Sequence, residues 1–149
     1  MSKTKLATEF SKAEDSPGLL LWQLSNKWQA KQRAALKTFG LTHVQFVLLA
    51  TLTYAEGTVR FTQKQLAEYA QIDEMMTSQV LRKLEQKELV KRRVSKIDKR
   101  AFTISATPHG IKLANQAVRI VEEVDRQFFG VLEREKISAF TETMRRLVE

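Results

Sequence analysis

Two short helical patterns separated by a tight turn are the feature that most constrains the fold of this chain. The first covers residues 63–70 and follows Thr62, which has a glutamine three positions later in the arrangement of a capping box. The second covers residues 74–87, where Asp73 is in position to cap the helix and the apolar side chains share one face. These apolar residues are Val80, Leu81 and Leu84. Two short helices joined in this way predict a helix-turn-helix.

A hairpin pattern follows the second helix directly. Residues 89–95 and 101–106 are rich in apolar and β-branched side chains, which predicts two strands. The charged segment 96–100 joins them and would form the tip of the hairpin. A further short strand is expected over Thr58–Phe61, just ahead of the helix pair. The order of these elements predicts a winged module over about residues 42–107.

Helical periodicity also predicts longer helices on both sides of this module. Serine or threonine caps followed by proline, and a glycine able to end a helix, mark the boundaries of these helices. Their expected spans are 17–39, 42–54, 108–130 and 134–148, and Leu6, Phe10 and Ala13 also stand at helical spacing. The segments at about 1–40 and 108–149 carry more apolar surface than the module can cover. We therefore expect them to pair with a second copy of the chain.

The expected fold class is mainly α with a small β-hairpin wing. It is a winged helix-turn-helix with N- and C-terminal dimerisation helices, in one domain of residues 1–149. The longest apolar runs are far too short to span a bilayer, and residues 1–15 lack the apolar centre of a signal peptide. We therefore expect a cytoplasmic protein that does not use a membrane.

The residue types disfavour several classes of function. The chain has no cysteine, which excludes disulfides, thiolate metal sites, cysteine nucleophiles and thiol-based redox sensing. It has only two histidines, His43 and His109, and its five glycines form no phosphate-binding loop. No nucleophile, base and orienting group cluster in the sequence, so an enzyme is the weaker alternative. We expect no metal and no cofactor.

Positive charge is concentrated in one short segment. Residues 82–100 contain nine basic and three acidic residues, so they hold a net charge of +6 out of +8 for the whole chain. This segment covers the second helix of the helix-turn-helix and the hairpin, where Lys and Arg could neutralise DNA phosphates. A solvated, solubilising face is the alternative for the charge run. A winged module that serves only as an interaction or architectural scaffold is the alternative for the whole chain.

Several motifs then occur in a familiar order. Residues 84–92 read LEQKELVKR, residues 98–100 read DKR and residues 107–110 read TPHG, while residues 42–52 have the form T-x-x-Q-x-x-x-L-x-x-L. Together they resemble the MarR (multiple antibiotic resistance regulator) family of winged helix-turn-helix transcription factors, over about residues 17–147. The sequence departs from that family at Glu88, where glycine is frequent, and at Ala106, where leucine is frequent. It also begins the second helix of the pair with Asp73-Glu74-Met75-Met76 instead of small polar residues.

The resemblance implies a homodimer that binds a pseudo-palindromic operator in double-stranded DNA, commonly as a repressor. It also implies release from DNA when a small, often phenolic, ligand binds between the DNA-binding lobe and the dimerisation helices. Family members that sense oxidants through cysteine offer no parallel, because this chain has none.

The candidate DNA-binding residues lie on three elements. Side chains on the outer face of the second helix can read bases in the major groove, and the start of the first helix can hold a phosphate. In the wing, Asp98 would orient Arg100 into the minor groove, a role that the resemblance implies. The full set is Thr62, Gln63, Lys64, Met75, Ser78, Gln79, Arg82, Lys83, Lys96, Asp98, Lys99 and Arg100.

Each of these roles has a structural alternative. Thr62 would also act as a simple helix cap, and Asp98 with Arg100 as a surface ion pair. Met75 would pack in the core, because it and its neighbour Met76 are not both expected to face outward.

A second candidate site would bind a small aromatic effector. Aromatic side chains with a few polar tips suit a flat ligand, and six such residues occur on the first two long helices. They are Trp22, Trp28, Phe39, His43, Phe46 and Tyr54. Ordinary core and dimer packing is the alternative for each of them.

Overall fold

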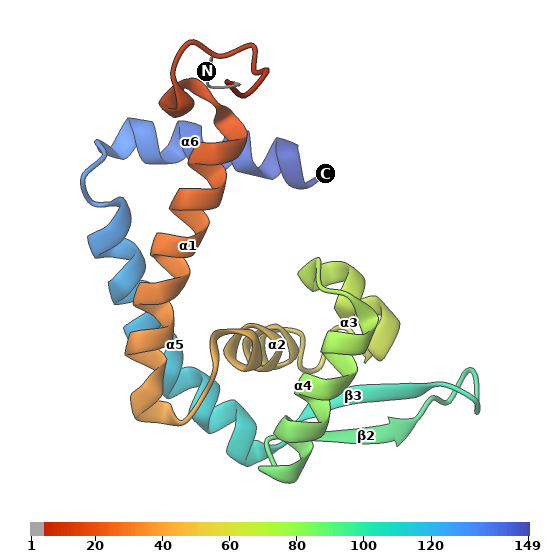
Figure 1. Ribbon diagram of the computed structural model, residues 1–149. Coiled ribbons are helices and arrows are strands. Elements are labelled where there is room, and N and C mark those ends of the chain that lie inside the picture. The colour runs from red at the N-terminus through yellow and green to blue at the C-terminus, as the bar shows by residue number, and fades with distance from the viewer. Residues whose placement is uncertain (1–4) are drawn as a thin grey trace.

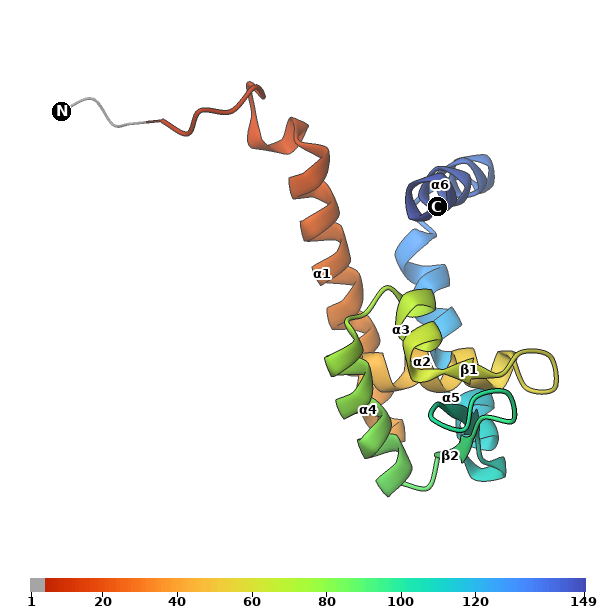
Figure 2. The same ribbon diagram turned by 90° about the vertical axis from the view of Figure 1, so that its right-hand side faces the viewer.

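The computed structural model describes residues 5–149 and consists mainly of helices around a small sheet (Figure 1). A lobe that holds the sheet and three of the helices occupies one end of the molecule. Two long helices, α1 and α5, lead away from that lobe, and α6 follows α5 at the far end (Figure 1), where the turned view shows it apart from α1 (Figure 2). The main helices are α1 (Pro17–Leu36), α2 (His43–Tyr54), α3 (Gln63–Ala70), α4 (Glu74–Gln86), α5 (Pro108–Phe129) and α6 (Arg134–Val148). This confirms the expected mainly α fold with a small β-hairpin wing.

The first long helix begins where its local signals place it, and its α-helical part ends at Leu36, three residues before the expected end at residue 39. The Ser16 hydroxyl accepts a hydrogen bond from the Leu19 N–H, and Pro17 stands at the first helical position. A 3₁₀ turn over Lys37–Phe39 follows the helix. This turn ends at Gly40, whose φ is 64°. The spacing of Leu6, Phe10 and Ala13 does not produce a helix, since the residues described before α1 form only the short 3₁₀ turn Ala13–Asp15.

Helix α2 forms the centre of the lobe. Thr42 and Gln45 close a capping box at its start, as their spacing predicts. Leu48 and Leu49 are fully buried, and the core around them draws on α1, α2, α3, α4, α5, β2 and β3. The apolar character of this helix therefore reflects its burial within the lobe. Tyr54 at its last turn is the exception, with 92% of its surface exposed.

The helix-turn-helix forms with the expected caps. Thr62 and Gln65 make the second capping box, and the Asp73 carboxylate accepts a hydrogen bond from the Met76 N–H at the start of α4. Gln71 turns the chain between the two helices in a left-handed conformation, with φ of 57°. Helix α4 ends one residue before the expected Lys87.

The sheet has three antiparallel strands in the order β1–β3–β2. The hairpin strands β2 (Val90–Val94) and β3 (Phe102–Ala106) fall inside their expected spans. Strand β1 (Phe61–Thr62) is shorter and lies later than the expected Thr58–Phe61. The difference arises because α2 ends in a turn in which the N–H groups of Thr58 and Val59 donate to the Ala55 carbonyl. Those residues are therefore unavailable for pairing with β3.

The wing and α5 meet at a tight contact. The Thr107 hydroxyl accepts from the Gly110 N–H and donates to the Glu88 carbonyl, at 3.0 and 2.6 Å respectively. Gly110 packs so closely against the wing that an added Cβ would lie 2.0 Å from the Leu89 carbonyl oxygen. Glycine is therefore required at this position. The contact fixes the base of the hairpin against the start of α5.

Within residues 5–149, no single helix combines the length and the apolar character needed to cross a bilayer. Only the bent pair Pro17–Phe39 and His43–Tyr54, at 74° to each other, reaches both together.

Candidate nucleic-acid interface

The outer face of α4 is the first part of the candidate interface. Thr77 and Leu84 are buried and define the inner side of the helix. Because successive residues are about 100° apart around a helix, Met75, Gln79 and Arg82 lie on the opposite side. All three are exposed. The structure therefore presents one amide, one guanidinium and one thioether on a helix face where they could contact base edges.

Residues at the margins of this face complete the α4 set. Lys83 is exposed and Ser78 is half-buried. Met76 is 44% exposed and Met75 is 74% exposed, so the expectation that the two methionines do not both face outward is wrong. The physical reason is that the buried side of α4 is centred on Thr77, which leaves Met76 at the edge of the core.

The start of α3 supplies a second part. Thr62 is half-buried and acts as the cap, as its Oγ1 accepts a hydrogen bond from the Gln65 N–H. Gln63 is half-buried and Lys64 is exposed in the same first turn. A capped helix start with an adjacent ammonium group suits a phosphate.

The wing tip is the third part. Asp98 Oδ1 accepts a hydrogen bond from the Arg100 backbone N–H at 3.0 Å and lies 3.5 Å from the Arg100 Nε. The Arg100 side chain is 95% exposed, and Lys96 and Lys99 are exposed beside it. Asp98 thus holds the backbone of Arg100 while the guanidinium faces solvent. Sequence reasoning overlooked Ile97, whose 99% exposure makes it an apolar side chain at the very tip.

Two members of the basic segment are engaged inside the molecule. Lys87 Nζ donates to the Gly40 carbonyl at 2.7 Å and to Gln45 Oε1 at 3.2 Å, which holds the end of α4 against the start of α2. Arg92 Nε lies 3.3 Å from Glu85 Oε2, without the alignment of a hydrogen bond, and connects β2 to α4. These two cations hold α4 against the start of α2 and against β2. The partners of Lys87 lie 47 and 42 positions away in the sequence, so local patterns do not reveal them.

The structure brings together only part of the predicted aromatic set. Trp28 and His43 meet edge to face, with ring centroids 5.0 Å apart. Phe39 is half-buried near the α1–α2 junction, and Phe46 is buried in the core. Tyr54 lies eleven residues beyond His43 along α2, about 16 Å away along the helix axis. Trp22 is 70% exposed on the outer half of α1.

A polar network that the sequence did not reveal lies beside Trp28. Asp125 Oδ1 on α5 accepts hydrogen bonds from Trp28 Nε1 at 2.7 Å and from Gln32 Nε2 at 2.9 Å. Gln32 is fully buried, and its Oε1 has no hydrogen-bond partner among the described residues. Burial lowers the pKa of His43 below its ordinary value of 6.5, and Arg33 lowers it further, whereas Asp125 raises it. A neutral imidazole is therefore favoured at this junction.

Comparison with known proteins places this geometry in a family. The MarR family model matches residues 41–102, which span the core of the lobe and most of the wing. The chain is 44% identical to YdcH of Bacillus subtilis, described as an uncharacterized HTH-type transcriptional regulator, over 83% of this chain and 84% of that protein. It is 31% identical to an HTH-type transcriptional repressor of Mycobacterium tuberculosis, over 80% of this chain and 85% of that one.

A solved structure agrees with these sequence relationships. The Staphylococcus aureus MepR–DNA complex superposes with a TM-score of 0.80 at 26% identity, covering 89% of this chain and 96% of MepR. The relatives and the fold are those of transcriptional regulators and not of enzymes. With its helix-turn-helix, its basic wing and these matches, the chain belongs to the MarR family of helix-turn-helix transcriptional regulators.

Proposed function

We propose that this regulator acts in the cytoplasm as a homodimeric repressor that binds a pseudo-palindromic operator in double-stranded DNA. The observation that carries the proposal is the position of α4 beside the β2–β3 hairpin in one lobe (Figures 1 and 2). The exposed face of α4 and the basic wing tip extend from that lobe, so a single duplex can meet both. The repressor role is supported by the description of the Mycobacterium tuberculosis relative.

Each DNA contact has a proposed role that follows from side-chain chemistry. Gln79 would pair with adenine, Arg82 with guanine or a phosphate, and Met75 would touch a thymine methyl group. Arg100 would enter a narrow minor groove, where the negative potential of A·T-rich DNA attracts a guanidinium. The first turn of α3, which includes Lys64, would contact phosphates, and so would Lys83, Lys96 and Lys99. These contacts would set the register of the protein on the duplex.

Homodimerisation is supported by apolar side chains left exposed outside the lobe. They occur on the first half of α1, on α5 and from the end of α5 through α6, so the proposed dimerisation segments remain about 1–40 and 108–149. These side chains are Leu20, Leu21, Trp22, Leu24, Ile120, Val131, Leu132, Met144, Leu147 and Val148. A surface of this kind is typical of a subunit interface. Two-fold pairing through it would present two copies of α4 to the two half-sites of an operator.

A small aromatic acid is the proposed effector, and the junction of α1, α2 and α5 is its proposed location. Trp28 and His43 offer aromatic edges there, and the unpartnered Gln32 Oε1 could accept a hydrogen bond from a ligand hydroxyl. A ligand at this junction would contact helices of the proposed dimerisation region and of the DNA-binding lobe together. It could therefore alter their relative orientation.

Footprinting on the DNA upstream of the protein's own gene tests the proposal. A discrete protected site with two-fold symmetry and half-sites about one helical turn apart is expected for a dimer of this architecture. Diffuse protection that disappears uniformly as salt is added would instead support an architectural, sequence-independent role. Addition of aromatic acids to the same reaction tests for an effector, which should release the protected site.

A further inference from the structure

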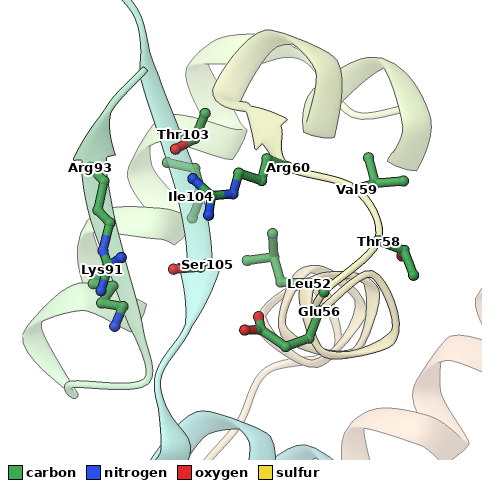
Figure 3. Close-up of a pocket in the computed structure, with 11 residues that line it drawn as sticks. Leu52, Glu56, Thr58, Val59, Arg60, Lys91, Arg93, Thr103, Ile104 and Ser105 are labelled. Atoms are coloured by element: carbon green, nitrogen blue, oxygen red, sulfur yellow. The ribbon is translucent and has the colours of Figure 1, made fainter. Parts of the chain in front are cut away.

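A recessed cavity of about 260 Å³ lies between the wing sheet and the loop that follows α2. Its lining is mainly polar and includes three basic side chains, one carboxylate and the hydroxyl groups of two residues on β3. They are Arg60, Lys91, Arg93, Glu56, Thr103 and Ser105. Figure 3 shows Arg60 extending from the loop toward β3, with Lys91 and Arg93 on β2 beyond it.

The sheet register explains why these side chains meet. Lys91 pairs with Ser105, and Arg93 pairs with Thr103, across the β2–β3 ladder. Side chains two residues apart on a strand share one face, so these four lie on the same side of the wing. Arg60 directly precedes β1, the strand that pairs with the other side of β3. The intervening Arg92 belongs to the opposite face, where it contacts Glu85 of α4.

The positive charges of this cavity are not compensated within the protein. Among residues 5–149, no carboxylate oxygen lies within 4.0 Å of the charged nitrogens of Arg60, Lys91 or Arg93. Glu56 is the one acidic residue in the lining, so three cations face one anion. A recess with a net positive charge and hydroxyl donors beside it favours an anionic ligand.

We propose that this cavity is a binding site for a small phosphorylated metabolite, held by its phosphomonoester group. Guanidinium groups match the oxygens of a phosphate in geometry, and an ammonium adds a compact charge. The dianionic form of a phosphomonoester also balances the excess charge of the lining. The volume of the cavity leaves room for a few atoms beyond the phosphate.

The position of the cavity favours a small molecule over the DNA backbone. The proposed DNA contacts lie on the outer face of α4, at the start of α3 and at the wing tip, whereas the cavity lies against the face of the wing sheet opposite Arg92, which contacts α4. Its floor is recessed beneath the α2–β1 loop (Figure 3), and a duplex presents its phosphates on a convex surface. The site does not rest on the proposed repressor function.

Inorganic phosphate is the probe for the test, added to the full chain at constant ionic strength with chloride as the balancing anion. Backbone amide resonances report where it binds. Saturable shifts are expected at Thr103, Ser105 and the 56–60 loop. Arg60→Gln should weaken phosphate binding by about ten- to a hundredfold, the usual effect of losing a hydrogen bond to a charged group. Glu56→Gln should strengthen binding by about two- to fivefold, because it removes the opposing charge.

Matched variants distinguish this site from the DNA surface. Arg82→Gln on α4 removes the same charge and should leave the phosphate titration unchanged. Arg60→Gln should leave binding to a duplex from the upstream region within about twofold. If Arg60→Gln lowers the melting temperature, Lys91→Gln serves as a second variant that removes a cation from the cavity. Phosphate shifts that match those of chloride, or that persist in both cavity variants, overturn the proposal. Equal losses of duplex and phosphate binding in Arg60→Gln would assign the cavity to the DNA backbone instead.

Discussion

Glu88 occupies a left-handed backbone conformation, with φ of 59°, at the point where α4 turns into β2. A residue with a Cβ is strained in this region by about 1–2 kcal/mol, and glycine is not. The family to which the chain belongs often has glycine here. The strain is tolerated because hydrogen bonds hold the peptide groups on both sides of the residue. The Glu88 N–H donates to the Glu85 carbonyl, while the next N–H, of Leu89, donates to the Leu84 carbonyl and the Glu88 carbonyl accepts from the Thr107 hydroxyl.

Glu88→Gly should therefore raise the free energy of unfolding by about 0.5–1 kcal/mol, because relief of strain exceeds the added entropy of the unfolded chain. Urea denaturation measures it. Glu88→Gln is the matched control, since it removes the charge and keeps the strain. Gly40→Ala should have the opposite effect and destabilise the protein by about 1 kcal/mol, because an alanine is strained at the Gly40 φ of 64°. No neighbouring atom lies within 4 Å of the added Cβ, so this change in stability would reflect the backbone conformation and not a steric clash. Equal stability of Glu88→Gly and Glu88→Gln would show that the conformation costs nothing.

At the wing tip, Arg100→Ala should weaken operator binding more than Lys99→Ala, although each removes one positive charge. Loss of directed hydrogen bonds in the minor groove would add roughly 1–3 kcal/mol to the electrostatic loss. Asp98→Ala should also weaken binding, because the Asp98 carboxylate accepts from the Arg100 N–H and lies beside its Nε. Simple charge counting predicts the opposite sign for Asp98→Ala.

Titration of the three wing variants against one duplex, at one fixed salt concentration, separates these accounts. Tighter binding by Asp98→Ala, together with equal losses for the two cationic variants, would reduce the wing to a non-specific charged loop.

At the scale of helices and strands, local signals predict the elements and distant contacts fix how they are joined. The caps at Ser16, Thr42 and Thr62 involve residues three positions apart, so the sequence alone reveals them. The bond between Trp28 and Asp125 joins residues 97 positions apart, and no local pattern signals it. The late start of β1 has the same origin, because the turn after α2 competes with the sheet for the same backbone groups. The candidate DNA face was predictable for the same reason as the caps, since it depends on the phase of a single helix.

The junction of α5 with the wing gives a prediction at this scale. Gly110→Ala should destabilise the protein by about 3 kcal/mol or more, since the added Cβ would lie 2.0 Å from the Leu89 carbonyl oxygen and the backbone must move. Gly18→Ala is the control within α1. There the nearest atom to the added Cβ is Ser16 Oγ at 3.9 Å, and replacing a helical glycine should stabilise by about 0.5–1 kcal/mol. Thermal unfolding of both variants checks the pair, and a neutral Gly110→Ala would mean that the contact is loose.

The packing of α1, α2 and α5 around His43 predicts a pH dependence of stability. The pKa of His43 is lowered in the folded protein, so the unfolded chain binds the proton more readily. The stabilisation is present above the ordinary value of 6.5 and is lost as the pH falls through the lower pKa of the folded state. His43→Gln should reduce the loss of unfolding free energy between about pH 7 and pH 5, measured by urea denaturation at each pH. An unchanged slope in the variant would contradict the assignment to His43.

At the scale of the whole molecule, the lobe with α4 and the wing stands apart from the far ends of α1 and α6 (Figure 1). Charge and apolar surface are divided in the same way. The basic segment 82–100 belongs to the lobe, and most of the large exposed apolar side chains outside it belong to the first half of α1 and to the segment from the end of α5 through α6. The division fits a molecule that binds a polyanion at one end and another apolar surface at the other.

Operator binding by such a dimer should depend steeply on salt. Roughly eight to twelve phosphate contacts give a slope of about −7 to −11 in a plot of log K against log salt concentration. Lys87→Gln should leave that slope nearly unchanged, because its ammonium group is bonded to Gly40 O and Gln45 Oε1. Lys64→Gln should reduce the magnitude of the slope by about two, because each of the two protomers loses one phosphate contact. A wild-type slope shallower than about −3 would mean that the basic segment does not lie on the DNA.

The contact between Gly110 and Leu89 places the backbone of the long helix α5 directly against the backbone at the base of the hairpin. Side chains can adjust their rotamers when an element moves, whereas two backbones in direct contact cannot. A displacement of α5 at Gly110 should therefore displace the backbone at Leu89 as well. We therefore expect the hairpin to move together with the end of α5, with Arg100 at its free tip. Any tilt of α5 at the far end of the molecule becomes a sideways displacement of that tip, so the reach of the wing is set by the helix that carries it.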